Sequence, residues 1–439
     1  MNRALAEAIV GCLRLSGETC AVSVLRKFRL RDWERTLNWL DSAGLTLYLL
    51  QRLKSIGATE LVPPPVLARF ERNLADNRRR IAYLAAEFAS LNERFNRAGV
   101  NYAAIKGFSL VPTLCPDAIL RTQDDLDYLV DKPSLPVAQR VLEQAGYCLR
   151  RLSDIEFKFV RPSSKIPTVS DDPYSLETEL LIELHLAFWN RKNRVLINEP
   201  EFRLDQTIDH DWRGLRFPVL KQEDAFVLQV LHVFQHTLEC WVKLCWLLEI
   251  GYFVRAKSSD TQFWDRVDVR LREVPFLVEF AAIVLGLVDR VFAAPMPPIA
   301  AKWTQCLRPP ARVWLENYGR IWVIEEHPYD SSSCFSAAKL AFFLHREFLP
   351  DPEARKEITR QRLFPWKQPQ QIAVPADRSA ASVLTAGRLQ WQFVMRRLIF
   401  HLGSSSRYLL EMPRWRELNR LFAGASHQPE TTPPGGLSN

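Results

Sequence analysis

The sequence predicts an α+β protein in which a small mixed-sheet core is flanked by an N-terminal and a C-terminal helical region. Three observations predict this fold class: apolar residues recur at helical spacing over residues 31–99, short runs alternate as strands do over residues 100–188, and helical spacing returns after residue 221. The chain has 439 residues, of which 47% are hydrophobic. A chain of this size forms roughly two to four structural units with apolar cores.

We expect four regions along the chain. The N-terminal helical region covers residues 1–99, the α/β core covers residues 100–220, and the C-terminal helical region covers residues 221–424. Residues 425–439 are rich in Pro, Gly, Ser and Thr, which predicts a disordered tail.

The ends of two N-terminal helical stretches are marked in the sequence. The first covers residues 31–57 and closes on Gly57, because glycine favours helix termination. After three prolines at 63–65, an amphipathic pattern continues over residues 67–95 and ends at Gly99.

The predicted core consists of short strands joined by turns and one helix. Residues 162–173 are rich in Ser, Pro and Asp and predict a loop within it. The expected strands are VNYAAI (100–105), DLDYLV (125–130), YCLRR (147–151), FKFV (157–160) and a run within LETELLIELHLAF (176–188), and the expected helix is LPVAQRVLEQAG (135–146).

Two carboxylates emerge from the same face of the strand DLDYLV. Asp125 and Asp127 are two residues apart, and a strand points residues i and i+2 the same way. Two like charges this close raise each other's proton affinity unless a positive charge lies between them. The usual positive object is a divalent metal ion, so we predict that both residues are metal ligands.

A turn and a second strand add polar groups to this pair. At Lys106-Gly107, glycine permits close backbone approach to a ligand and lysine can bind a phosphate as a point charge. In LETELLIELHLAF, alternation puts Glu179, Glu183 and His185 on one face. We expect Glu183 to be the third carboxylate, although Glu179 equally meets the pattern.

Three carboxylates beside a glycine turn on a small sheet suit two-metal nucleotidyl transfer. Two Mg²⁺ ions held by acidic ligands bind a triphosphate and activate the attacking hydroxyl. Mg²⁺, or Mn²⁺ in its place, prefers the hard oxygen ligands that aspartate and glutamate supply.

The run IKGFSLVPTLCPDAILRTQDDLDYLV (105–130) resembles the polymerase-β-like nucleotidyltransferase superfamily, in which a glycine turn precedes a D-x-D strand. It is most similar to bacterial nucleotidyltransferase family proteins, which carry Lys-Gly and an arginine four residues before the first aspartate; Arg121 and Asp125 have this spacing. IELHLAF (182–188) resembles the acidic-x-His strand of that family. HVFQHTLECWVKLCWLLEIGYFV (232–254) resembles its helical segment, with His236 and Lys243.

The resemblance implies a nucleotidyltransferase core that transfers a nucleotidyl group from an NTP to an acceptor and releases pyrophosphate. It implies that Asp125, Asp127 and Glu183 hold the metal ions and that Lys106, Gly107 and Arg121 bind the nucleotide. The acceptor is open and can be a small molecule, a sugar, a peptide or a protein. Possible supporting or acceptor-binding residues are His185, His236 and Lys243.

Two alternatives belong to other classes. A glycosyltransferase also uses a D-x-D motif to hold a metal ion against a nucleotide diphosphate, but it normally builds a larger nucleotide-binding unit before that motif. A binding or scaffold protein can keep the fold without turnover, but buried acids without a metal would then cost stability.

The remaining features bear on partners and location. The net charge of +8 favours anionic partners, yet it does not by itself support nucleic-acid binding. The stretch 388–422 interleaves arginines with aromatic residues, as nucleic-acid and membrane surfaces do, and a basic amphipathic helix is its commoner meaning. His232 and His236 are spaced to share a helix face, and we expect both to be packed. The absence of a signal peptide, a membrane span and paired cysteines predicts a cytoplasmic protein.

Overall fold

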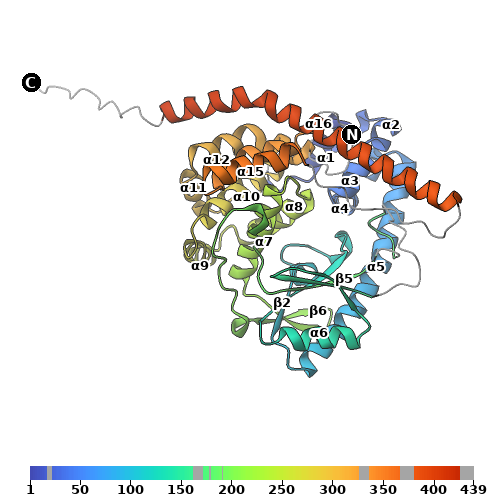
Figure 1. Ribbon diagram of the computed structural model, residues 1–439. Coiled ribbons are helices and arrows are strands. Elements are labelled where there is room, and N and C mark those ends of the chain that lie inside the picture. The colour runs from blue at the N-terminus through green and yellow to red at the C-terminus, as the bar shows by residue number, and fades with distance from the viewer. Residues whose placement is uncertain are drawn as a thin grey trace, which may run out of the picture.

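A computed structural model describes residues 1–16, 22–161, 172–176, 179–189, 191–325, 336–365 and 380–425. Within these residues it contains one seven-stranded mixed sheet, in the order β3-β4-β5-β2-β1-β7-β6, and helical regions on both sides of it in the sequence (Figure 1). The expected α+β class is confirmed. The predicted tail and most of the predicted loop at 162–173 lie outside the described residues.

The three central strands bring distant parts of the core together. Strand β2 (Asp125–Val130) lies between β1 (Tyr102–Ile105), which is antiparallel to it, and β5 (Leu181–His185), which is parallel to it. In this register Asp127 is opposite Glu183. Side chains at paired positions of neighbouring strands point to the same face of the sheet, so the two carboxylates share one face.

Two further pairs of strands complete the sheet. On one side, β4 (Glu156–Val160) is antiparallel to β5 and pairs with β3 (Cys148–Leu152). On the other side, β7 (Leu215–Val219) is parallel to β1 and forms a hairpin with β6 (Ile208–Trp212). The sequence reading did not anticipate this hairpin.

The turn of that hairpin has only a weak signal in the sequence. Arg213 and Gly214 both have positive φ, 54° and 82°, as the two central residues of a tight hairpin turn require. Arginine rarely adopts that conformation, so Arg-Gly is a weak turn signal compared with Asn-Gly or Asp-Gly.

Different helices cover the two faces of the sheet. Helix α5 (Pro64–Arg97) and helix α6 (Leu135–Gln144) lie on one face, where the ring of Phe88 stacks on that of Tyr128 with centroids 5.8 Å apart (Figure 1). On the other face, Leu129 packs in a smaller apolar cluster with Phe188 and with Leu228 of α7 (Gln222–Leu238). Asp125 and Asp127 alternate with Leu126 and Tyr128, so they point to the α7 face.

The N-terminal helices pack against α5 and one another, and α1 also reaches the C-terminal helical region. Residues 31–57 form three short helices instead of one long helix, because the chain turns at Thr36 and again at Gly44, where φ is 71°. Helix α1 contacts α10 (Leu277–Phe292) and α13 (Arg320–Glu325), so the first helix of the chain packs with helices from its second half (Figure 1). The N-terminal helices are α1 (Arg3–Cys12), α2 (Leu30–Glu34), α3 (Leu37–Ser42) and α4 (Thr46–Ser55).

The C-terminal helical region ends in one exceptionally long helix, α16 (Ala380–Ala425), which crosses the other helices (Figure 1). None of the helices in the described part of the chain is long and apolar enough to cross a membrane. The other helices of this region are α8 (Leu244–Lys257), α9 (Thr261–Arg272), α10 (Leu277–Phe292), α11 (Pro298–Gln305), α12 (Pro309–Trp314), α13 (Arg320–Glu325), α14 (Ala341–His345) and α15 (Pro352–Leu363).

Candidate active site

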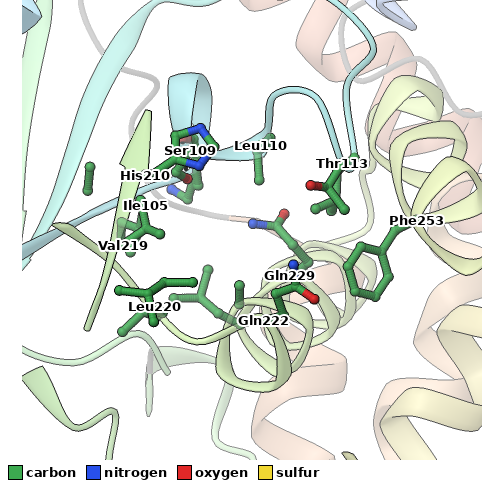
Figure 2. Close-up of a pocket in the computed structure, with 16 residues that line it drawn as sticks. Ile105, Ser109, Leu110, Thr113, His210, Val219, Leu220, Gln222, Gln229 and Phe253 are labelled. Atoms are coloured by element: carbon green, nitrogen blue, oxygen red, sulfur yellow. Dashed lines mark hydrogen bonds between the residues drawn. The ribbon is translucent and has the colours of Figure 1, made fainter. Parts of the chain in front are cut away.

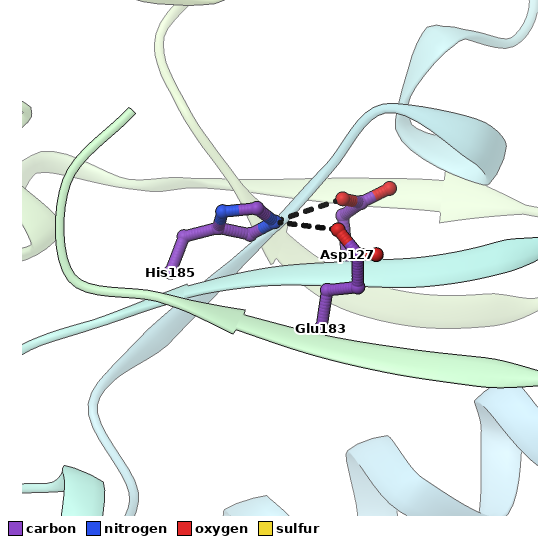
Figure 3. Close-up of side chains that lie close together, drawn as sticks. All are labelled: Asp127, Glu183 and His185. Atoms are coloured by element: carbon purple, nitrogen blue, oxygen red, sulfur yellow. Dashed lines mark hydrogen bonds and ion pairs between the residues drawn. The ribbon is translucent and has the colours of Figure 1, made fainter. Parts of the chain in front are cut away.

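Two carboxylates and an imidazole converge on the α7 face of the sheet. One potential ligand atom each from Asp127, Glu183 and His185 lies within 4.8 Å of the others, and all three side chains are buried. His185 Nε2 is 2.9 Å from Asp127 Oδ1 and 3.5 Å from Glu183 Oε2, so one ring nitrogen faces both carboxylates (Figure 3). The three residues form a compact oxygen and nitrogen donor set.

Two lysines balance the charge of this donor set. Lys106 Nζ donates a hydrogen bond of 2.8 Å to Asp127 Oδ1. Lys158 of β4 is the partner of Glu183 in the strand register and forms an ion pair with its carboxylate. The sequence reading missed Lys158: its position between Phe157 and Phe159 in a strand was a signal, but only the pairing of β4 with β5 shows which carboxylate it meets.

The electrostatics of the cluster follow from these contacts. Burial opposes ionisation of Asp127, but Lys106 and His185 outweigh it and hold the pKa of the carboxyl well below its usual range. Burial likewise opposes ionisation of Glu183, yet the hydrogen bond from His185 lowers the pKa of Glu183. Burial would lower the pKa of His185, but its bonds to both carboxylates raise that pKa to about 9. At neutral pH the cluster therefore contains two carboxylates and a protonated imidazole.

Asp125 lies beside this cluster in a different protonation state. Its side chain is on the same face of β2 as that of Asp127 and is half-buried. Burial, and then the neighbouring charge of Asp127, raise the pKa of Asp125 to about 7. The two aspartates of the D-x-D motif thus differ: Asp127 is ionised and paired, whereas Asp125 titrates near neutrality and lies outside the tight donor set of Asp127, Glu183 and His185.

The Lys106-Gly107 turn has an unusual backbone. Lys106 has φ 59° and ψ −165°, and Gly107 has φ 48°. Such a conformation is costly for a residue with a side chain and is found where function demands it. A Cβ on Gly107 would lie 2.4 Å from Nε2 of Gln123, whose amide donates 2.9 Å to the carbonyl of Asp125. Glycine therefore allows the turn to pack against the start of β2.

The segment before β2 is held by the long helix α5. Asn77 Nδ2 donates to the carbonyls of Ile119 and Arg121 at 2.7 and 3.1 Å. Arg80, whose side chain is fully buried, donates from Nε to the carbonyl of Gln123 at 2.9 Å. These bonds satisfy buried carbonyl groups and fix where the D-x-D strand begins.

Arg121 is placed in an ion pair with a residue from the C-terminal region. Its Nε lies 3.2 Å from Oε1 of Glu249 in α8, and both side chains are buried. The Tyr48 hydroxyl donates 2.9 Å to the same oxygen. Burial acts to lower the pKa of Arg121, but Glu249 and then other anions including Asp125 raise it overall. The phosphate contact expected for Arg121 remains a prediction.

The other expected residues do not belong to this donor set. Glu179 forms an ion pair with Arg150. Lys243 precedes the first turn of α8. His236 packs against Trp241 with ring centroids 4.1 Å apart, and its Nδ1 is 3.4 Å from a carboxylate oxygen of Glu239.

A small pocket adjoins the Lys106-Gly107 turn. It has a volume of about 70 Å³ and lies between the turn, the β6–β7 hairpin and α7; Gln222 and Gln229 face Ser109 and Leu110 across it (Figure 2). A cavity of this size holds a few water molecules and no whole nucleotide. Lys106 lines the pocket and also binds Asp127, so it connects the two.

Comparison with known proteins agrees with this architecture. The family model described as "uncharacterised nucleotidyltransferase" matches residues 29–293, which is more than half of the chain and includes the whole sheet. No curated protein matches the chain. The matched region contains the D-x-D strand, the Lys-Gly turn, Glu183 and the Glu249 partner of Arg121, and the chain therefore belongs to this nucleotidyltransferase family.

Proposed function

We propose that the protein is a metal-dependent nucleotidyltransferase that transfers a nucleotidyl group from an NTP to a hydroxyl or similar acceptor and releases pyrophosphate. The observation that carries the proposal is the pairing of Asp127 with Glu183 across parallel strands, with His185 facing both carboxylates. The family match supports the reaction class and leaves the acceptor open.

The residues present fit a divalent ion. Asp127, Glu183 and His185 supply two carboxylates and an imidazole within 4.8 Å of one another. Carboxylates suit Mg²⁺ and Mn²⁺, and the imidazole nitrogen favours Mn²⁺ of the two. A bound ion would neutralise the triphosphate and lower the pKa of the acceptor hydroxyl. His185 would give up its proton on binding the ion, because a histidine ligand is neutral.

The protein's own cations define the remaining roles. Lys106 is half-buried, donates to Asp127 at 2.8 Å and lies on the turn with the strained backbone. We assign it to the phosphates, which would draw its ammonium group away from Asp127 when the nucleotide binds. Lys158 stays with Glu183 and orients that carboxylate. Asp125, with a pKa raised to about 7 by burial and by Asp127, can take or release a proton near the acceptor.

A binding experiment tests the proposal without knowledge of the acceptor. Titration calorimetry with each NTP in the presence of Mn²⁺ or Mg²⁺ should show metal-dependent binding to the wild type. Asp127→Asn should remove it, because an amide keeps the shape and loses the charge that pairs with Lys106. Asp124→Asn is the matched control: Asp124 is adjacent in sequence but pairs with Arg80 at 3.4 Å.

The outcomes separate the alternatives. Equal nucleotide affinity in Asp127→Asn and wild type would refute the site assignment. No nucleotide binding by the wild type would favour the scaffold alternative. Once an acceptor is found by NTP-dependent labelling of lysate fractions, release of pyrophosphate supports the proposal, whereas release of a nucleoside diphosphate from a nucleotide sugar would identify a glycosyltransferase.

A further inference from the structure

The long helix α16 exposes a stripe of large apolar side chains. Its members are spaced by seven or four residues, which places them on one side of a helix. Between 48% and 72% of each side chain is exposed. The stripe consists of Leu384, Trp391, Leu398, Leu402 and Leu409.

The stripe is separate from the side of α16 that packs on the protein. Tyr408 and Trp415 are buried, and both stack on Phe343 with ring centroids 4.5 and 4.8 Å apart. Ser405 accepts a hydrogen bond from Lys339 and donates one to a backbone carbonyl of α15. The buried contacts of α16 are thus concentrated in its C-terminal half. Over residues 384–402, only Ala386 is buried.

The charged residues in the N-terminal half of α16 are all basic. The sequence from residue 378 to residue 410 contains no Asp or Glu. Arg388 is exposed beside the stripe, and Arg396 is exposed on another side of the same helix. Past Leu409 the same side of the helix continues with Arg416 and Arg420, which are also exposed. Within residues 378–410, the exposed surface of α16 therefore combines large apolar side chains with arginines and contains no acidic residue.

We propose that α16 docks on an anionic lipid surface, with the stripe inserted at the boundary between headgroups and acyl chains and the arginines on the headgroup phosphates. A helix with an apolar side and flanking basic residues lies in the plane of a membrane in this way. A face of this kind on a protein surface marks an interaction site.

Other occupants fit the observations less well. In a symmetric dimer through this stripe, the arginines of one copy would approach those of the other, and the segment has no acidic residue to compensate them. Nucleic acid would use the arginines and Trp391, but it gives no role to Leu398, Leu402 and Leu409.

Vesicle flotation tests the proposal with the full chain. We expect binding to vesicles of phosphatidylcholine with roughly 30% phosphatidylglycerol to exceed binding to phosphatidylcholine alone by about tenfold or more, and to weaken in roughly 0.5 M NaCl. Leu398→Gln with Leu402→Gln should lower binding by about tenfold or more, because it removes two inserted side chains. Arg388→Gln with Arg396→Gln should remove the preference for the anionic lipid.

The matched control replaces equally exposed apolar residues elsewhere. Leu196→Gln with Val269→Gln, at positions 62% and 66% exposed, should leave vesicle binding unchanged. All these positions are on the surface, so thermal unfolding should be unaffected. Three results would overturn the proposal: no binding to either vesicle, equal binding by the Leu398 and Leu402 variant, or a dimer in light scattering that this variant dissociates. Binding to RNA that depends on the arginines but not on the leucines would overturn it too.

Discussion

Removing the charge of Glu249 should destabilise the protein strongly. Glu249 is 2% exposed and Arg121 is 9% exposed, and their charged groups are 3.2 Å apart. Breaking a buried ion pair by removing one partner costs about 3–5 kcal/mol, because the other charge stays buried without compensation. The Glu249→Gln variant keeps the length of the side chain and the acceptor for the Tyr48 hydroxyl. We therefore expect a loss of about 3 kcal/mol, the lower end of that range.

Urea unfolding followed by tryptophan fluorescence measures this loss. The matched control is Glu93→Gln, which breaks the exposed pair of Glu93 with Arg97 on α5, where the side chains are 62% and 75% exposed. Such surface pairs contribute less than about 1 kcal/mol. Arg121→Met combined with Glu249→Leu should recover most of the stability, because replacing both partners leaves no unpaired charge.

A small effect of Glu249→Gln would refute this reasoning and change the reading of the site. If the loss were under about 1 kcal/mol, well below the cost of an unpaired buried charge, Arg121 would have another partner within reach. Asp125 is among the groups that raise the pKa of Arg121, so it is a candidate for that partner. Arg121 would then belong to the D-x-D cluster, and its expected contact with the nucleotide phosphates would gain support.

Three further predictions concern single residues. Glu183→Gln should lower turnover by roughly a hundredfold or more, whereas Glu179→Gln should change it little, because only Glu183 belongs to the donor set. Steady-state kinetics with the identified acceptor measure both effects. A larger effect at Glu179 would contradict this prediction. Gly107→Ala should lower the free energy of unfolding in urea by about 1–3 kcal/mol, because its φ is positive and the added Cβ would be crowded. Gly214→Ala should lower it less, because a Cβ there meets nothing within 4 Å. Equal losses in the two variants would contradict this prediction. Burial lowers the pKa of Lys339 from 10.5 to about 8, so the unfolded chain binds more protons between these values. The stability of the wild type relative to Lys339→Met should therefore rise from about pH 8 to about pH 10.5, by roughly 3 kcal/mol, and parallel unfolding curves for the two proteins would contradict it.

The sequence by itself determined those strands and helices whose residue pattern lies within one short segment of the chain. The alternation of DLDYLV predicts a strand with Asp125 and Asp127 on one face, and the structure has a strand with those bounds. The long amphipathic pattern ending at Gly99 predicts helix α5, because a buried stripe on a helix repeats at a fixed spacing along the chain. These features depend on neighbours in sequence, so the sequence contains the information directly.

Only the tertiary structure decided which distant residues meet. The parallel pairing of β2 with β5 puts Asp127 opposite Glu183, and the pairing of β4 with β5 adds Lys158 to the same face. Packing of α8 against the core gives Arg121 its partner Glu249. Strand register and helix packing minimise the free energy of the whole chain, and a shift by one residue would turn these side chains to the other face. No pattern within a short segment of sequence specifies that choice.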